Sequence, residues 1–253
     1  MDKRIVNILW TGGLDSSFRV IELSQMNVII QPYYISDPVR KSQSYELNAI
    51  KKITKIIRTH SQTKATLLDV KIIQLNEIPS DSNITDTFNL LHEKYIIGHQ
   101  YDLIARYAHH NDIRFEMGLE KSDRSKAINC LKSECKLSPY IDGDYKVYRV
   151  DPDGSTKAGI ILFSNIDLPM SLWNLTKPEE IERIKELGHL NTVKHTWFCH
   201  FPVFGLPCGH CNPCQDSLNE GLAFRVPRLG RLLYYVYRPY YIIKWHLNKL
   251  ICK

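Results

Sequence analysis

A glycine-rich octet near the start of the chain has the residue types that bind phosphate groups. It spans residues 10–17, between an apolar run at 5–9 and a segment with the apolar spacing of a helix. Adjacent glycines let the backbone approach a ligand closely, and a helix start offers free N–H groups to phosphate oxygens. We therefore expect a strand, a turn and a helix around a phosphate site formed by Thr11, Gly12, Gly13, Leu14, Asp15, Ser16 and Ser17.

Two widespread phosphate-binding loops do not fit this octet. The triphosphatase loop G-x-x-x-x-G-K-[ST] requires a lysine, and residues 10–17 contain none. The octet also lacks the G-x-G-x-x-G pattern, so a Rossmann dinucleotide site is not expected. The alternative without a ligand is an ordinary strand-to-helix turn in which Asp15 caps the helix.

Four cysteines in the second half of the chain have the spacing of a metal site, C-x8-C-x2-C-x2-C. They are Cys199, Cys208, Cys211 and Cys214. Four thiolates can surround one tetrahedral Zn²⁺ and leave no open position, so we expect one structural zinc per chain. An iron–sulfur cluster and free thiols remain alternatives, although a ferredoxin-type run would continue with a cysteine near position 218, where Leu218 stands.

Bulk composition is that of an ordinary folded protein. The chain has 253 residues, of which 43% are hydrophobic and 24% are charged. No signal-peptide pattern opens the sequence, and no stretch approaches the ~18 apolar residues of a membrane span. We expect a cytoplasmic protein, in which Cys130 and Cys135 are structural thiols rather than a disulfide.

Apolar patterning predicts an α/β fold with a parallel sheet between two layers of helices. Strands are expected at 5–9, 28–35, 67–75 and 115–119, helices at 45–57 and 95–110, and a polar loop at 79–87. Alternation of strands and helices implies parallel pairing, with the ligand site at the carboxyl ends of the strands. Segments 145–150 and 160–163 are predicted to form a hairpin or a long insertion, and a capping box at Thr176 begins a further helix.

The C-terminal segment differs from the rest of the chain in charge. The net charge is +6, and residues 225–253 hold no acidic residue but seven basic ones: Arg225, Arg228, Arg231, Arg238, Lys244, Lys249 and Lys253. Apolar residues recur there at helical spacing from Leu229 to Leu250, with a kink expected at Pro239. Three uses stay open: packing on the body or in a homodimer, contact with an anionic membrane, or contact with nucleic acid.

These features divide the chain into three expected parts. Residues 1–198 would form the nucleotide-binding α/β domain, 199–224 the zinc-binding segment, and 225–253 a basic amphipathic tail. The first boundary precedes Cys199, the first cysteine ligand. The second precedes the segment that has no acidic residue.

The octet resembles the S-G-G-x-D-S loop of the PP-loop ATP pyrophosphatases, with Thr11 in place of the first serine. The resemblance implies cleavage of ATP to AMP and pyrophosphate. It also implies that Gly12, Gly13, Ser16 and Ser17 hold pyrophosphate and that Asp15 is associated with Mg²⁺.

Motifs further along resemble 7-cyano-7-deazaguanine synthase within that superfamily. They lie at 175–181, 185–188, 196–199, 207–214 and 223–224, in the same order as in the family. The resemblance implies a three-layer fold of the adenine nucleotide α-hydrolase type. It also implies an ATP-dependent ligase that adenylates the carboxylate of 7-carboxy-7-deazaguanine, after which ammonia displaces AMP and gives an amide. A second ATP then activates the amide oxygen, and loss of AMP leaves the nitrile. Lys177 would reach a phosphate, or else stand solvated in the first turn of its helix.

Some family segments are altered here. The helix start Pro-Gly-Arg-Asn appears as residues 97–100, and the G-x-x-x-x-D strand end is kept from Gly118 to Asp123, which places Gly118 in the nucleotide site. The family's next segment, near the substrate base, is replaced at 124–126. The open alternatives are activation of another carboxylate, on a metabolite or a protein, a tRNA-modifying enzyme, and a non-catalytic zinc-knuckle adaptor.

Overall fold

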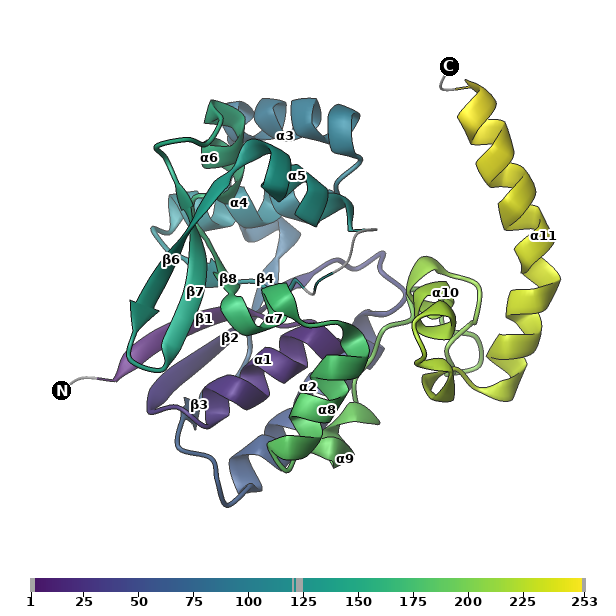
Figure 1. Cartoon of the computed structure of the whole chain (residues 1–253), viewed down its shortest axis with the longest axis horizontal. Helices are drawn as coiled ribbons and strands as arrows, with labels where there is room; N and C mark the ends of the chain where they lie inside the picture. The colour runs from purple at the N-terminus through teal and green to yellow at the C-terminus, as the bar shows by residue number, and fades with distance from the viewer. Residues whose placement is uncertain (1–2, 120, 122–124, 252–253) are drawn as a thin grey trace.

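The protein is built on one mixed, mostly parallel sheet. The computed structural model describes residues 3–119, 121 and 125–251, and describes side chains up to residue 240. Within these residues eight strands form a sheet in the order β3-β2-β1-β5-β8-β7-β6, with β4 also paired to β2 (Figure 1). The strands are β1 (Arg4–Leu9), β2 (Val28–Ser36), β3 (Thr66–Leu67), β4 (Lys71–Gln74), β5 (Phe115–Glu116), β6 (Lys136–Asp142), β7 (Tyr145–Asp151) and β8 (Ile166–Pro169).

Helices cover both faces of the sheet, which gives the three layers expected from the sequence (Figure 1). One apolar core lies beneath α1 (Leu14–Ser24), α2 (Gln43–Thr59), α8 (Lys177–Glu186) and α9 (Leu190–Val193). A second core lies beneath α3 (Ser82–Tyr95), α4 (Gln100–His110), α5 (Lys126–Glu134) and α6 (Lys157–Phe163). The short helix α7 (Met170–Asn174) links β8 to α8.

Strand pairing confirms the parallel centre of the sheet and adds an antiparallel edge. β1 runs parallel to β2 and to β5, and β5 runs parallel to β8. The strands β6, β7 and β8 pair antiparallel. The carboxyl ends of β1, β2 and β5 therefore meet at one edge, where the glycine-rich loop lies.

Two helix boundaries differ from the sequence prediction. The expected loop at 79–87 contains the start of α3, because the Asp81 carboxylate accepts a hydrogen bond from the Ile84 N–H and caps the helix. The expected single helix at 95–110 is only α4, which starts at Gln100. Ile96 adopts a left-handed conformation with φ 56° and ends α3.

Predicted strands 67–75 and 160–163 are also corrected. The first is two short strands, β3 and β4, which both pair with β2. The second is helix α6, capped by the Thr156 hydroxyl, which accepts from the Gly159 N–H. The strand that forms a hairpin with β7 is β6. It is an edge strand and contains Pro139, which is tolerated there because one side of the strand is unpaired.

The capping box at Thr176 is confirmed. The Thr176 hydroxyl accepts a hydrogen bond from the backbone N–H of Glu179, and the Glu179 carboxylate accepts one from the Thr176 N–H. α8 ends at Glu186, and Gly188 follows with φ +76°.

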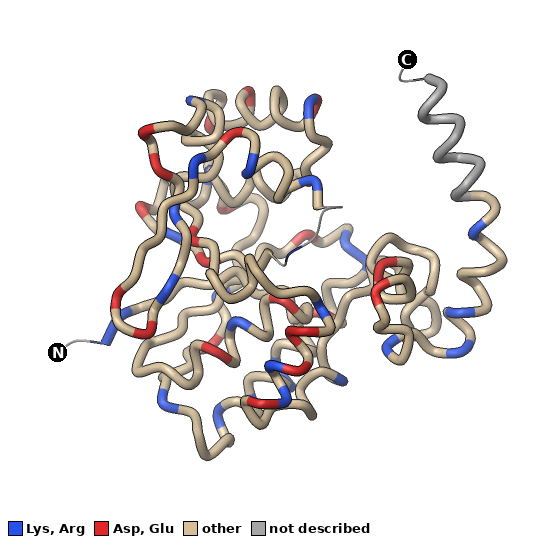
Figure 2. Tube along the Cα trace, in the orientation of Figure 1, with Lys and Arg blue, Asp and Glu red and all other residues tan. Residues whose placement is uncertain are grey.

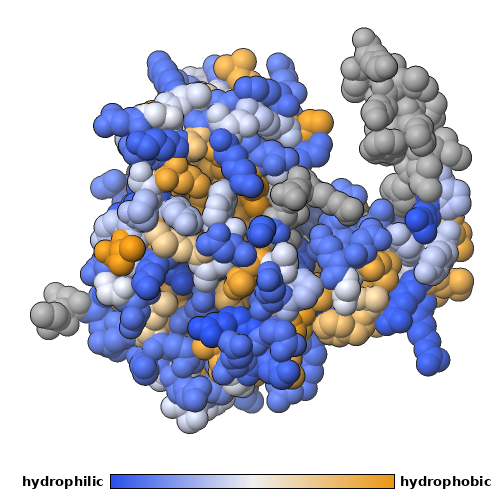
Figure 3. All heavy atoms as spheres, viewed as in Figure 1, coloured by the Kyte–Doolittle hydropathy of each residue, from blue (hydrophilic) through white to orange (hydrophobic). Residues whose placement is uncertain are grey.

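The chain ends in a long helix that stands away from the sheet. After α10 (Asn212–Asn219) and the short 3₁₀ helix η2 (Ala223–Arg225), α11 (Arg228–Ile251) extends beside the cysteine loop (Figure 1). Its described part carries basic and no acidic residues (Figure 2), and apolar side chains gather on its outer side (Figure 3). No helix of the described residues is long and apolar enough to cross a membrane.

A buried ion pair joins α1 to the centre of the sheet. The Arg19 guanidinium donates two hydrogen bonds to the Glu116 carboxylate, with N···O distances of 2.7 and 3.0 Å. Both side chains are almost fully buried, with exposed fractions of 3% and 1%. The pair joins α1 to β5, and therefore fixes that helix on the sheet.

Arg19→Met should destabilise the protein by about 3–5 kcal/mol, because it leaves the Glu116 carboxylate buried without its partner. Adding Glu116→Leu should recover much of that loss, since the carboxylate that lost its partner is then removed as well. Urea unfolding of the two single variants and the double variant measures this coupling. Strictly additive losses would contradict it.

Candidate functional site

The glycine-rich loop connects β1 to α1 and is fixed by close backbone packing. Gly12 has φ +70°, a conformation that residues with a side chain rarely adopt. A Cβ there would lie 2.9 Å from both the Ala49 Cβ and the Glu46 carbonyl oxygen. Gly12 thus allows α2 to pack directly on the loop, whereas the sequence analysis expected the missing side chain to admit a ligand.

The hydroxyls of the loop have different surroundings. The Ser17 hydroxyl is buried and accepts a hydrogen bond from the Trp10 indole N–H at 2.9 Å, so it holds the loop together. The Ser16 hydroxyl is also buried, and no described residue offers it a hydrogen-bond partner. The first N–H groups of α1 have no partner within the helix. Ser16 and this helix start therefore present donors toward the adjacent cavity.

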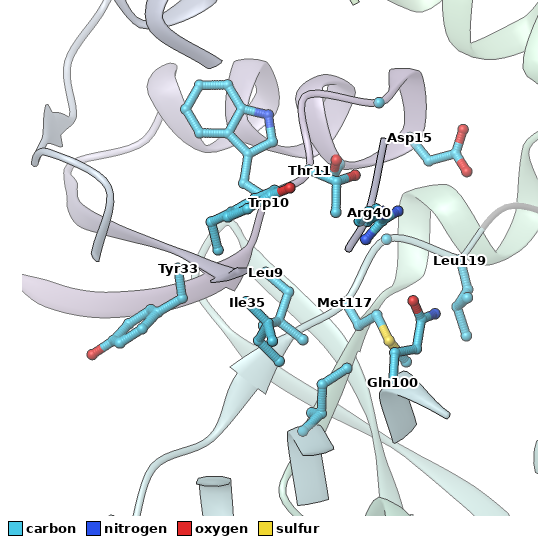
Figure 4. Close-up of a pocket in the computed structure, with 15 residues that line it drawn as sticks. Leu9, Trp10, Thr11, Asp15, Tyr33, Ile35, Arg40, Gln100, Met117 and Leu119 are labelled. Carbon is cyan, nitrogen blue, oxygen red and sulfur yellow. The ribbon is translucent and has the colours of Figure 1, made fainter. Parts of the chain in front are cut away.

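That cavity lies at the carboxyl ends of β1, β2 and β5 and has a volume of about 220 Å³. In Figure 4, Thr11, Asp15 and Arg40 lie on one side, and Met117 and Gln100 face them from the other. Its walls combine the loop with apolar and aromatic side chains: Leu9, Trp10, Tyr33, Tyr34, Ile35, Ile104, Met117 and Leu119. We call it the loop cavity.

Gly118 closes one wall of the loop cavity. A Cβ at this position would lie 3.1 Å from the Ser16 nitrogen and 3.2 Å from the Asp15 carbonyl carbon. The end of β5 can therefore approach the start of α1. Asp123 and Arg124, which the sequence analysis also considered, lie outside the described residues.

A second cavity, of about 270 Å³, lies on the other side of the same loop. Thr11, Gly13, Asp15 and Arg40 line both cavities. The second one also receives side chains from distant parts of the chain: Glu46, Lys177, Trp197, His200, Asp216 and Arg225. We call it the cationic cavity, because Arg40, Lys177 and Arg225 converge there.

Arg40 was not predicted as a site residue, and a buried carboxylate holds it in place. The Arg40 guanidinium pairs with Glu46 at 3.1 Å. The Glu46 carboxylate also accepts hydrogen bonds from the hydroxyls of Tyr34 and Ser42, both at 2.7 Å. Burial and the neighbouring Glu46 raise the pKa of Tyr34, which keeps its hydroxyl a donor.

Arg225 was also missed, since the sequence analysis counted it with the charges of the tail. Its side chain donates to the Thr196 hydroxyl at 2.7 Å and lies 4.4 Å from the centre of the Phe198 ring. Burial lowers the pKa of Arg225 to about 10, so the guanidinium remains charged at neutral pH. One cation of the expected tail therefore belongs to the cationic cavity.

Lys177 lies in this cavity rather than in open solvent, with 20% of its side chain exposed. Its ammonium is 3.8 Å from Glu220. His200 lies in the same cavity, where burial and then the charge of Arg40 lower the pKa of the imidazole. At neutral pH the cavity thus combines three cations with a neutral histidine and with the acidic side chains of Asp15, Glu46 and Asp216.

The four predicted cysteine ligands come together in one buried cluster. All four sulfur atoms lie within 4.8 Å of one another. The Cys208–Cys214 and Cys199–Cys211 sulfur pairs are 4.0 and 3.9 Å apart. Zinc–sulfur bonds of ~2.3 Å in a tetrahedron place sulfur atoms ~3.8 Å apart, so the donor set fits a four-coordinate metal. Backbone N–H groups of Cys208 and Cys211 also donate to the sulfurs of Cys199 and Cys208.

Trp197 connects the cysteine cluster to the glycine-rich loop. Its backbone N–H donates to the Gly12 carbonyl at 2.8 Å, and its indole N–H donates to the Cys199 carbonyl at 2.8 Å. The ring stacks on Tyr45 of α2, with ring centres 4.5 Å apart. One residue therefore contacts the loop, α2 and the first cysteine ligand.

The chain is similar to known proteins in structure rather than in sequence. No protein-family model matches the sequence, and no curated protein sequence matches it. Among solved structures, the chain is similar to a 4-thiouridine synthetase in complex with RNA and bound ATP, with 17% identity and a TM-score of 0.40. The match covers 93% of this chain but 53% of that protein, so the chain spans about half the length of the structure it matches.

Proposed function

We propose that the chain is an ATP-dependent, AMP-forming enzyme that activates a carboxylate. The observation that carries the proposal is the position of the glycine-rich loop between two cavities. Its helix start and the Ser16 hydroxyl point toward the loop cavity, and three cations converge on the cationic cavity. The proposed reaction is that of 7-cyano-7-deazaguanine synthase, with 7-carboxy-7-deazaguanine and ammonia as the other substrates.

The loop cavity suits a nucleotide. Its apolar and aromatic wall, with Tyr33, Ile35 and Met117, offers contact to a flat base. The helix start and Ser16 offer N–H and O–H donors to phosphate oxygens, which are favoured at the positive end of a helix dipole. In this proposal Thr11, Gly12, Gly13, Leu14, Ser16, Ser17 and Gly118 form the ATP site.

The cationic cavity suits the departing pyrophosphate and the carboxylate substrate. A carboxylate oxygen would attack the α-phosphorus, the bond to the bridging oxygen would break, and pyrophosphate would leave. Charge develops on the leaving oxygens, where fixed cations stabilise it most effectively. In this proposal Arg40, Lys177 and Arg225 have this role, because all three line the cationic cavity and Arg40 also lines the loop cavity.

Asp15 supplies the carboxylate that a magnesium ion requires beside phosphate groups. It lines both cavities, and carboxylate oxygens are preferred ligands of Mg²⁺. Bound Mg²⁺ would neutralise charge on the phosphate oxygens. The cysteine cluster would hold zinc in a structural role, because its four thiolates leave no open coordination position.

Arg40→Met should lower the rate of ATP–pyrophosphate exchange about 100- to 1000-fold, because it removes a positioned cation from the reacting phosphates. The matched control is Arg58→Met, which removes an arginine paired to Asp69 on the surface. The control should retain the wild-type rate. The exchange assay contains ATP, Mg²⁺, labelled pyrophosphate and 7-carboxy-7-deazaguanine. In a separate reaction with added ammonium and no added pyrophosphate, mass spectrometry detects the nitrile.

The same assay separates the competing functions. ATP–pyrophosphate exchange that requires another carboxylate and does not occur with 7-carboxy-7-deazaguanine would indicate a different substrate. Transfer of a group to tRNA would indicate an RNA-modifying enzyme. A protein that does not bind ATP at all would contradict catalysis and indicate an adaptor.

Purified protein should contain about one zinc per chain, and Cys208→Ser should lose it, because the cluster cannot complete a tetrahedron with three thiolates. Metal analysis of the purified chain measures this stoichiometry. Cys130→Ser is the matched control, since Cys130 is a buried thiol outside the cluster. It should keep the zinc. Iron with a visible absorption band would contradict zinc, and a metal-free native protein would contradict a metal site.

A further inference from the structure

The described part of α11 turns its apolar side away from the protein. Leu229, Leu232 and Val236 recur at intervals of three and four residues, so they share one face of the helix. Their exposed fractions are 43%, 61% and 63%. Amphipathic helices usually bury such a face, and no described residue covers this one. Orange spheres mark its position at the outer edge of the molecule in Figure 3.

The opposite side of α11 makes the contacts with the body. Gly230 packs against the backbone of Pro207 and Gly209. The Tyr234 hydroxyl donates to Asn219 at 3.3 Å, and the Tyr237 ring lies 4.9 Å from the centre of His210. These residues are spaced by four and three positions, and they are offset from the apolar face. The contacts to the body therefore leave the apolar face available to a partner.

Charge indicates what kind of partner fits this face. The last acidic residue of the chain is Glu220, and α11 adds basic side chains at Arg228, Arg231 and Arg238 (Figure 2). Beyond residue 240 the sequence continues both patterns, with Ile243, Leu247 and Leu250 at the apolar spacing and with Lys244 and Lys249. Two copies of such a helix would repel each other, so the charge disfavours a homodimer through this face.

The aromatic residues of α11 favour a membrane surface over nucleic acid as its binding partner. Tyrosines are frequent in the sequence of α11, at positions 234, 235, 237, 240 and 241, and tyrosine rings favour the boundary between water and acyl chains. Nucleic acid would attract the arginines but would leave the leucine face in water. An anionic bilayer satisfies both the apolar face and the basic side chains.

We propose that α11 binds the surface of an anionic membrane, lying in its plane with Leu229, Leu232 and Val236 toward the acyl chains. The basic side chains contact the lipid head groups, and the body remains on the aqueous side because it contacts the opposite side of α11. The proposal does not depend on the reaction proposed above.

Sedimentation with vesicles tests this proposal on the full-length, metal-loaded protein. Vesicles of phosphatidylcholine with phosphatidylglycerol should bind the chain at least about 10-fold more tightly than phosphatidylcholine alone, and 0.5 M salt should weaken the binding. Leu232→Ser with Val236→Ser should weaken it about 10-fold or more, because the apolar face drives insertion. Arg228→Gln with Arg238→Gln should have an effect of similar size.

The matched control replaces two hydrophobic residues of equal exposure elsewhere. Leu90 on α3 and Ile141 on β6 are 66% and 62% exposed, and their replacement by serine should leave vesicle binding unchanged. Zinc content shows that each variant keeps its cysteine loop.

Three outcomes would overturn the proposal. The first is equal vesicle binding by the wild type and the Leu232→Ser, Val236→Ser variant, which would mean unspecific charge attraction. The second is a dimer that this variant converts to a monomer, with no vesicle binding. The third is salt-sensitive RNA binding without vesicle binding, which would assign the helix to nucleic acid.

Discussion

The arrangement of the site depends on how closely α2 approaches the backbone of Gly12. Any side chain at this residue would overlap α2, and its carbonyl accepts a hydrogen bond from the Trp197 N–H. The contact brings Glu46, and with it Arg40, beside the loop, while Trp197 brings the cysteine loop to the same point. The glycine-rich loop and Trp197, which are more than 180 residues apart in the sequence, thus line the same cavity because Gly12 lacks a Cβ.

Local signals in the sequence predicted those elements whose caps and apolar spacing agree. The loop, α1, β2 and the capped start of α8 belong to this group. The prediction of a loop at 79–87 was wrong because the first turn of α3, which Asp81 caps, is as hydrophilic as a loop. The apolar residues of α6 are too few to distinguish a helix from a strand, and only the Thr156 cap indicates which forms.

Residues of the candidate site could be predicted only where their spacing in the sequence itself indicates a chemical function. Four cysteines within sixteen positions indicate a candidate metal-binding cluster before any fold is known. Arg40 and Arg225 carry no such signal, because their neighbours in space, Glu46 and Thr196, acquire meaning only after the chain has folded. Arg225 shows this most directly, since in sequence it is the first cation of a basic tail.

The contact between Gly209 and Gly230 has a mechanical consequence. A Cβ on Gly209 would overlap the Gly230 carbonyl, so α11 meets the cysteine loop backbone against backbone, with no side chain between them that could yield. The helix is therefore a stiff extension of that loop. A force that tilts α11 acts as a torque on the cysteine loop and reaches Gly12 through two hydrogen bonds of Trp197. Load on the end of the chain and the shape of the glycine-rich loop are thus physically linked.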